Sequence, residues 1–147
     1  MAVASEYVLI CVAWPYSNGP LHLGHVAGCY LPPDIQARFE RAKGNKVLMV
    51  SGSDEHGTPI TVSAEIEGVE PQDIVDRYHK INKQALLDLG CSWEPNVDPR
   101  GIEYGGSLFN RTSDSRHKTI VQQNFTKLLE AGLFERRTTQ QLSLIHI

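Results

Sequence analysis

Residues 16–26 read Tyr-Ser-Asn-Gly-Pro-Leu-His-Leu-Gly-His-Val, and the rest of the predicted fold is arranged around this stretch. It follows directly on Tyr7–Ala13, a continuous apolar run typical of a fully buried strand. The turn signal Asn18-Gly19 separates this strand from a helix expected to begin near Leu21, and Pro20 suits the first positions of a helix. The stretch therefore predicts a strand, a turn and the start of a helix in close succession.

Two histidines mark the start of the predicted helix. His22 and His25 lie three residues apart and would share one helical face, which Gly24 leaves open to a flat ligand. Imidazoles at a helix N-terminus, above the carboxyl end of a strand, suit phosphate groups. The alternative is that both are ordinary surface or capping histidines. Because the strand, the turn and the glycine agree, we favour a phosphate site.

The next elements predict a crossover to a second strand. The helical pattern continues to about Tyr30, where Pro32-Pro33 should kink or end it, and Asp34–Lys43 forms a second helical piece. Val47–Val50 is an apolar run typical of a second buried strand. This order predicts a β-α-β unit, which is parallel and right-handed in nearly all known proteins.

A polar loop follows the second strand and reads Gly-Ser-Asp-Glu-His-Gly-Thr-Pro over residues 52–59. Asp54, Glu55 and His56 lie between glycines at the carboxyl end of a strand, the edge where ligands bind in open α/β sheets. The alternative is a loop that only caps the next helix through Thr58. Since Thr58 leaves three ionisable groups unexplained, we expect at least one of them to be functional.

Further along the chain, the pattern predicts three helices and a region of loops. The helices are Ile60–Glu67, Pro71–Leu89 and one from Thr112 to about Ala131, while residues 91–106 are predicted as loops and short extended pieces. We interpret the helix Pro71–Leu89 as scaffold. Its predicted apolar stripe consists of Ile74, Tyr78, Ile81, Ala85 and Leu89.

Length and composition indicate one core in a globular protein of ordinary polarity. The chain has 147 residues, 41% of them hydrophobic and 21% charged, with a net charge of −3 and no basic arm that would indicate nucleic acid. No apolar run is long enough to span a membrane. Cys11, Cys29 and Cys91 show no C-x-x-C spacing, so we expect buried free thiols and a reducing, cytoplasmic location.

Together these motifs resemble the class I aminoacyl-tRNA synthetases, and among them the methionyl-tRNA synthetase family. The His-Leu-Gly-His at His22–His25 matches the HIGH signature of the class, which other nucleotidylyltransferases share. The more discriminating stretch is Gly52–Pro59, which is similar to the second-strand loop of the methionine enzymes. Further similarity lies in Pro15-Tyr16-x-Asn18-Gly19, Arg41-x-Lys43-Gly44 and Arg137-Thr138-x-x-Gln141-Leu142, so the resemblance extends from Tyr7 to about Leu142.

The resemblance implies that methionine is activated with ATP and then transferred to the 3′ end of its tRNA. ATP would lie against His22 and His25 as catalytic residues, with Gly24, Asn18 and Gly19 completing the ATP-binding set, and Mg²⁺ would accompany it. Methionine's carboxylate would attack the α-phosphorus and displace pyrophosphate. The histidines would stabilise the charge that develops on the phosphoryl oxygens, without a covalent intermediate.

The resemblance also implies a methionine pocket at the same edge of the sheet. Asp54 would pair with the α-ammonium group of methionine, and Tyr16 would form part of the pocket wall. Ala13 and Trp14 would present backbone groups to the substrate. Trp14 stands where the family commonly has an aliphatic residue.

The fold class that follows is α/β, the N-terminal half of a Rossmann-type nucleotide-binding fold with parallel strands and crossover helices. The resemblance assigns residues 1–116 to this half, 117–142 to the start of an inserted connective domain, and 143–147 to a tail that does not match the family. The KMSKS-like loop, a zinc-binding part of the connective domain and the anticodon domain have no counterpart in the sequence. We therefore expect no metal site in the chain, and no activity from the chain alone.

Two alternatives stay open at this point. The first is another HxGH nucleotidylyltransferase, such as a coenzyme-precursor adenylyltransferase, many of which are complete at about this length. Against it stands the second-strand loop, which such enzymes have no reason to carry. The second is a non-catalytic nucleotide- or RNA-binding module, which would need the phosphate-facing helix but not Asp54.

Overall fold

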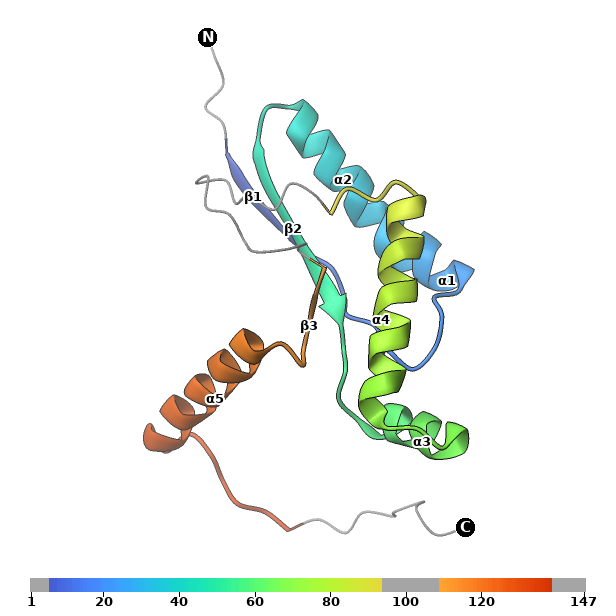
Figure 1. The fold of residues 1–147 in the computed structure, drawn as a ribbon. Helices are drawn as coiled ribbons and strands as arrows, with labels where there is room; N and C mark the ends of the chain where they lie inside the picture. The colour runs from blue at the N-terminus through green and yellow to red at the C-terminus, as the bar shows by residue number, and fades with distance from the viewer. Residues whose placement is uncertain (1–5, 94–108, 139–147) are drawn as a thin grey trace. The chain divides into compact units, whose positions relative to one another are not determined.

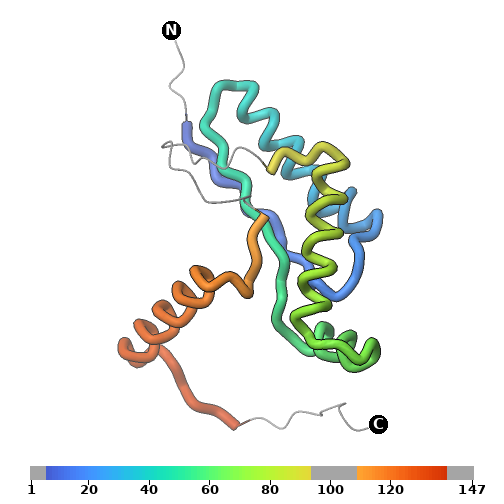
Figure 2. The backbone as a smooth tube through the Cα atoms, viewed as in Figure 1, coloured from blue at the N-terminus to red at the C-terminus, as the bar shows by residue number. Residues whose placement is uncertain are grey.

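The structure, a computed structural model, describes residues 6–93 and 109–138 (Figures 1 and 2). The predicted loops over most of residues 91–106, and the tail from 143, lie outside the described residues. The chain divides into two compact units, Met1–Asp114 and Ser115–Ile147, each of which is described by itself.

A parallel sheet forms the centre of the first unit. Its strands are β1 (Tyr7–Cys11), β2 (Lys46–Ser53) and β3 (Phe109–Arg111), in the order β1-β2-β3. β1 pairs with β2 from Tyr7↔Lys46 onward, and the end of β2 pairs with β3 from Ser51↔Phe109 onward. Parallel strands joined by helices confirm the predicted α/β class and the β-α-β unit.

Only one face of β1 is buried, so the prediction of a fully buried strand is wrong. Tyr7 and Leu9 are 62% and 61% exposed, whereas Val8 and Ile10, on the opposite face, pack against the core. The reason is that the crossover helix packs on one side of the strand pair. Cys11 points to the same face as Tyr7 and is exposed. All three cysteines are free, but only Cys91 is fully buried and Cys29 is half-buried.

The crossover consists of α1 (Leu23–His25), a π-helical turn η1 (Val26–Tyr30) and α2 (Leu31–Ala42). It begins at Leu23 rather than near Leu21, so Pro20 lies ahead of the helix. Pro32-Pro33 do not end the helix, because they occupy the first turn of α2, where a missing N–H breaks few bonds. The irregularity is taken up by η1, and wide turns of this kind are frequent at functional sites.

Three more helices follow: α3 (Thr58–Glu67), α4 (Pro71–Asp88) and, in the second unit, α5 (Ser115–Glu130). The predicted cap at Thr58 is wrong, since Gly57 takes the N-cap position with a φ of +128° that favours glycine. Gly68 ends α3 in the left-handed conformation, as its position predicts. No residue of α5 is buried.

The buried face of α4 differs from the predicted stripe. Ile81 and Leu89 are exposed, while the buried residues are Ile74, Val75, Asn82 and Leu86. Ile74 and Val75 form a small core with α3, and Leu86 joins the main core beneath the sheet. The largest members of that main core are Tyr30, Met49, Trp93 and Phe109. Helix α4 is thus fixed at both ends.

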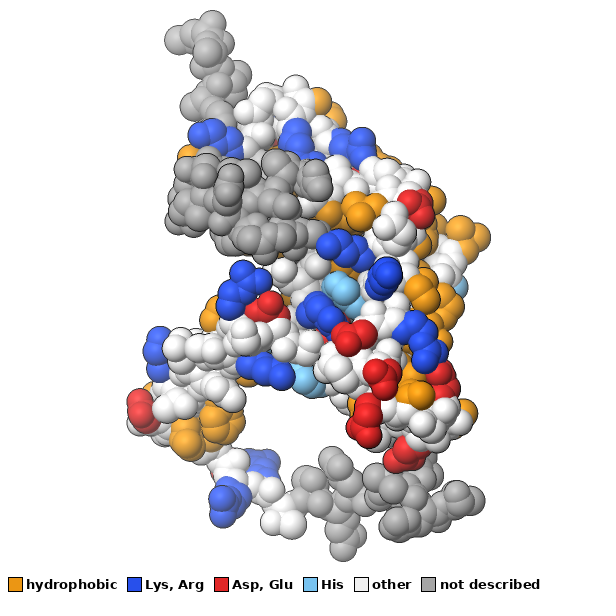
Figure 3. Space-filling model, viewed as in Figure 1, with side chains coloured by type: hydrophobic (Ala, Val, Ile, Leu, Met, Phe, Trp, Pro, Cys, Tyr) orange, Lys and Arg blue, Asp and Glu red, His pale blue; other side chains and the backbone are white. Residues whose placement is uncertain are grey.

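Charge is distributed unevenly over the face shown in Figure 3, where basic side chains gather around α4 and acidic ones near α3. Neither sign covers the whole face. Across residues 6–93 and 109–138, no helix has both the length and the apolar character needed to cross a membrane.

Candidate functional site

The loops that follow β1 and β2 lie side by side at the carboxyl edge of the sheet. The N–H of Asp54 donates to the carbonyl of Pro15 at 2.8 Å, and the N–H of Ser17 donates to the carbonyl of Asp54 at 2.9 Å. This pairing sets Tyr16 directly opposite Asp54. The structure therefore brings together two predicted methionine-binding residues that lie far apart in the sequence.

Trp14 and Ala13 pack against the end of β2. A Cβ atom added to Gly52 would lie 2.5 Å from Cζ3 of Trp14 and 2.3 Å from the carbonyl oxygen of Asn110, so only glycine fits between the indole and β3. The hydroxyl of Ser51 donates to the carbonyl of Ala13 at 2.9 Å, which occupies one lone pair of that oxygen. The large indole is accommodated because β2 offers bare backbone at this point.

His22 and His25 form a capped and stacked pair. His22 is the N-cap of α1, and its Nδ1 accepts from the N–H of Gly24 at 3.1 Å, while Nδ1 of His25 accepts from the N–H of His22 at 3.3 Å. The ring centroids are 3.8 Å apart. Since both Nδ1 atoms accept, the neutral rings carry their protons on Nε2, which leaves two N–H donors for a ligand.

This geometry corrects the predicted shared helical face. His22 lies before the helix rather than on it, and its ring covers Gly24, where an added Cβ would lie 3.0 Å from Cε1 of His22. Gly24 therefore makes room for the imidazole of His22.

Asn82 of α4 holds the turn that precedes the histidines. Its Nδ2 donates to the carbonyl of Gly19 at 3.0 Å, and its Oδ1 accepts from the N–H of Leu21 at 3.0 Å. No motif in the sequence indicated this role. A polar residue within an otherwise apolar helix face was the available signal.

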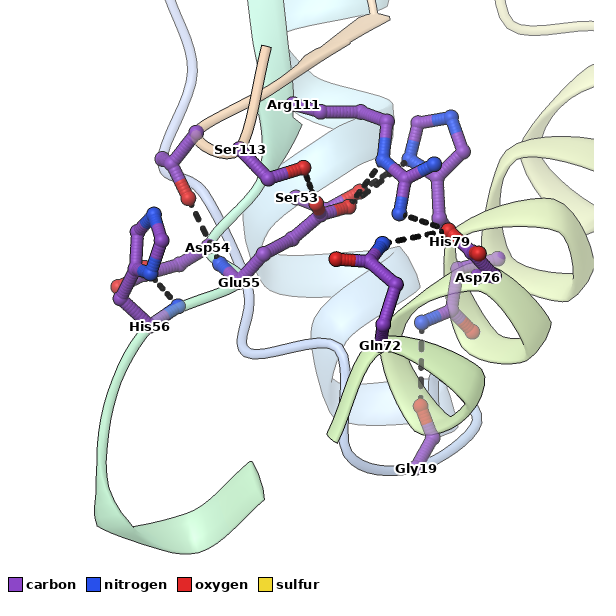
Figure 4. Close-up of polar contacts among 12 residues, drawn as sticks. Gly19, Ser53, Asp54, Glu55, His56, Gln72, Asp76, His79, Arg111 and Ser113 are labelled. Carbon is purple, nitrogen blue, oxygen red and sulfur yellow. Dashed lines mark hydrogen bonds and ion pairs between the residues drawn. The ribbon is translucent and has the colours of Figure 1, made fainter. Parts of the chain in front are cut away.

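Glu55 is a buried residue that holds the loop after β2 to the segment after β3, and its environment differs from that of Asp54. We call Glu55 and its partners Arg111, Thr112 and Ser113 the anchor. The carboxylate of Glu55, with no exposed surface, accepts from Nε of Arg111 at 2.6 Å and from the hydroxyl of Ser113 (Figure 4). The N–H of Glu55 donates to Oγ1 of Thr112 at 2.8 Å. Asp54 is only half-buried, and its Oδ1 accepts from the N–H of His56 at 3.4 Å. The two neighbouring carboxylates thus differ in environment, since that of Glu55 is buried and ion-paired and that of Asp54 is partly exposed.

The anchor extends to α4 through Arg111. Nη2 of Arg111 donates to Asp76, and His79 contacts both the hydroxyl of Ser53 and, at 3.7 Å, the carboxylate of Glu55. Burial lowers the pKa of His79, and the positive charge of Arg111 lowers it further. Hydrogen bonds from Arg111 and from Gln72 lower the pKa of Asp76. Burial opposes the charge of Arg111, but its bonds to Glu55 and Asp76 raise its pKa.

Within the described residues, no three His, Cys, Asp or Glu side chains gather in a way that could hold a metal ion. The site therefore consists of donors, carboxylates and aromatic surface.

Comparison with known proteins identifies the family. A family model described as tRNA synthetases class I (M) matches residues 8–144. The chain belongs to this family. The methionine–tRNA ligases of Bifidobacterium longum and Roseiflexus sp. are 48% and 46% identical to it over 92% and 90% of the chain. The chain spans about a fifth of the length of these relatives, 20% in both cases.

Solved structures of this class share the fold. A Mycobacterium tuberculosis methionyl-tRNA synthetase bound by methionyl-adenylate matches 88% of the chain with a TM-score of 0.70 and 26% identity, over 22% of its own length. An Agrobacterium radiobacter LeuRS in a ternary complex with tRNA and LeuAMS matches 88% of the chain with a TM-score of 0.68 and 28% identity. These class I matches favour a synthetase over another HxGH nucleotidylyltransferase.

Proposed function

We propose that the chain is part of a methionine–tRNA ligase, which activates methionine with ATP and transfers it to the 3′ end of tRNA. The observation that carries this proposal is the pairing of the two loops, which sets Tyr16 opposite Asp54 at the edge of a sheet whose first loop leads into the capped histidines. An amino-acid site and a phosphate site would then share the loop that follows β1, with Asp54 supplied by the loop that follows β2.

On the methionine side, Asp54 binds the α-ammonium group through a charge-assisted hydrogen bond. Its carboxylate lies outside the hydrogen-bond network of Glu55 and Arg111, which supports its use as a ligand for the ammonium group. The ring of Tyr16, half exposed, forms a wall of the pocket. Ala13 and Trp14 offer backbone groups, and the indole seated on Gly52 narrows the pocket beside them.

On the ATP side, the Nε2–H groups of His22 and His25 donate to phosphate oxygens. Asn18, Gly19 and Gly24 complete the nucleotide-binding segment. An oxygen of the methionine carboxylate forms a bond to the α-phosphorus while the bond to pyrophosphate breaks, and pyrophosphate leaves. Donors already fixed by backbone caps stabilise the developing charge with little reorganisation, and Mg²⁺ bound to ATP supplies further positive charge.

Residues 1–116 belong in this proposal to the N-terminal half of the catalytic domain, and residues 117–142 begin the inserted connective domain. Transfer to tRNA would need the full length of the ligase, and this chain matches about a fifth of the length of its relatives. Three free thiols fit a cytoplasmic enzyme.

The test is a chimera in which this chain replaces the matching segment of the Bifidobacterium longum ligase. Methionine-dependent ATP–pyrophosphate exchange should be measured first for this chimera. Asp54→Ala and the isosteric Asp54→Asn should both raise the methionine KM by about 30-fold or more and spare the ATP KM, because losing a desolvated charge partner costs about 2–5 kcal/mol. An unchanged methionine KM in both variants would remove Asp54 from the pocket.

The histidines should respond differently in the same chimera. His22→Ala and His25→Ala should each lower kcat by on the order of 10²-fold, the usual loss for one transition-state donor, while the methionine KM changes little. Weaker binding of ATP with kcat intact would make the pair a binding element and not a catalytic one.

A further inference from the structure

Asn82 is an amide side chain buried on the apolar face of α4. It is 2% exposed, and the other buried residues of that helix are Ile74, Val75 and Leu86. Burying an amide in apolar surroundings is costly unless both of its ends are hydrogen-bonded. The contacts of Asn82 therefore show what its polarity is used for.

Both ends of the amide bind one short turn, on either side of Pro20. The donor Nδ2 binds the carbonyl of Gly19 and the acceptor Oδ1 binds the N–H of Leu21, each at 3.0 Å, and Figure 4 shows the contact at Gly19. Pro20 has no N–H with which to pair. The side chain thus supplies the two-point pairing that a neighbouring strand would otherwise give.

The clamped turn leads directly into the histidines. Leu21 is followed by His22, whose N–H and ring both take part in the caps at the start of α1. At the other end, α4 is fixed by Leu86 within the main core. Packing and hydrogen bonds therefore connect the main core, through α4 and Asn82, to the stacked imidazoles.

We propose that Asn82 is a positioning residue, which sets where His22 and His25 present their Nε2–H groups. The proposal rests on the proposed function only in that the histidines act on ATP. The clamp on Gly19 and Leu21 fixes the turn, the turn fixes the N-cap, and the N-cap fixes the stacked pair. Reacting groups that shift by about 1 Å lose about 10²-fold in rate, so a remote clamp can control the chemistry.

The first test uses the chain itself and does not depend on activity. Asn82→Leu removes both bonds while keeping a side chain of four heavy atoms branched at Cγ, and Asn82→Asp keeps the acceptor for Leu21 but loses the donor for Gly19. Val47→Ala, in the main core near the start of β2 and outside α4, is the control for general loss of stability. Amide exchange at Leu21 and the NMR ring signals of His22 and His25 should be followed.

Asn82→Leu should speed exchange at Leu21 by tenfold or more relative to Val47→Ala and should shift the ring signals of both histidines. Asn82→Asp should shift the ring signals but protect Leu21 better than Asn82→Leu does. If Asn82→Leu does not fold, Asn82→Asp alone decides through the ring signals. Unchanged ring signals in the variants that fold would overturn the proposal.

The second test uses the chimera and separates this proposal from the proposed function. Asn82→Leu should lower kcat of pyrophosphate exchange by on the order of 10- to 100-fold with a methionine KM within about twofold of the parent, and Val47→Ala should leave kcat unchanged below its unfolding temperature. An unchanged kcat with displaced rings would overturn the positioning role. An inactive parent chimera would count against the proposed function, while the ring signals would still decide the clamp.

Discussion

Removing Arg111 should destabilise the first unit much more than removing its partner Glu55. The two side chains differ in exposure, because the Glu55 carboxylate has no exposed surface while Arg111 is 29% exposed. They also differ in partners, since Arg111 keeps Asp76, which is half exposed, when Glu55 is lost. Loss of Arg111 instead leaves a buried carboxylate without its cation.

The magnitudes follow from that asymmetry. Arg111→Met should cost about 3–5 kcal/mol, the usual penalty for a buried charge left without its partner. Glu55→Met should cost about 1.5–3 kcal/mol, the value of hydrogen bonds to a charged group, because the guanidinium still reaches Asp76 and water. The double variant should be more stable than Arg111→Met alone, because it contains no unpaired buried charge.

The assay is urea unfolding of each variant at neutral pH, followed by tryptophan fluorescence and extrapolated linearly to water. Arg77→Met is a matched control, because Arg77 pairs with Glu67 at the surface and its loss should change the free energy of unfolding little. Equal costs for Glu55→Met and Arg111→Met, or costs that simply add in the double variant, would refute the asymmetry.

Two further predictions concern the packing of β2 and the buried imidazole. Gly52→Ala should lower the free energy of unfolding by about 3 kcal/mol, since its Cβ would overlap Asn110 and Trp14. Gly28→Ala, with open space around it in η1, should instead raise the free energy of unfolding by about 0.5–1 kcal/mol. Thermal unfolding compares the two variants, and equal effects would contradict the close packing at Gly52. Burial and Arg111 lower the pKa of His79, so the unfolded state takes up its proton first, and the stability contributed above pH ~6.5 is lost as the pH falls below that value. His79→Asn should flatten the loss of unfolding free energy between pH 7.5 and 5.5, and an NMR titration of His79 at or above its ordinary pKa would contradict this reasoning.

The local sequence pattern was sufficient to predict the strands and the crossover that define the α/β fold class. Apolar runs predicted β1 and β2, and the distance between them predicted a parallel crossover. The position of Gly68 predicted the end of α3. These features depend on backbone propensity and hydrophobic period, which act within a few residues and are therefore visible in one sequence.

The predictions that were wrong depend on groups that are distant in sequence or on atomic detail. The start of α1 moved because the His22 ring accepts from the N–H of Gly24 and so caps the helix, and histidine is not among the residues that N-cap propensity favours. Glu55 and Arg111 are 56 residues apart and meet only because β3 pairs with the end of β2. The buried face of α4 was misjudged because Asn82 counts as polar in any hydrophobic pattern, although both ends of its amide are hydrogen-bonded inside the protein.

Helix α4 is linked to both loops of the candidate site. Asp76, His79 and Asn82 follow at intervals of three residues, so they lie along one side of the helix. Asp76 and His79 reach Arg111 and Ser53, which hold the loop with Asp54, while Asn82 holds the loop with the histidines. The interpretation of this helix as scaffold is thereby given a specific meaning. Because one helix contacts both loops, the packing of Ile74 and Leu86 in the two cores sets the relative position of the loops.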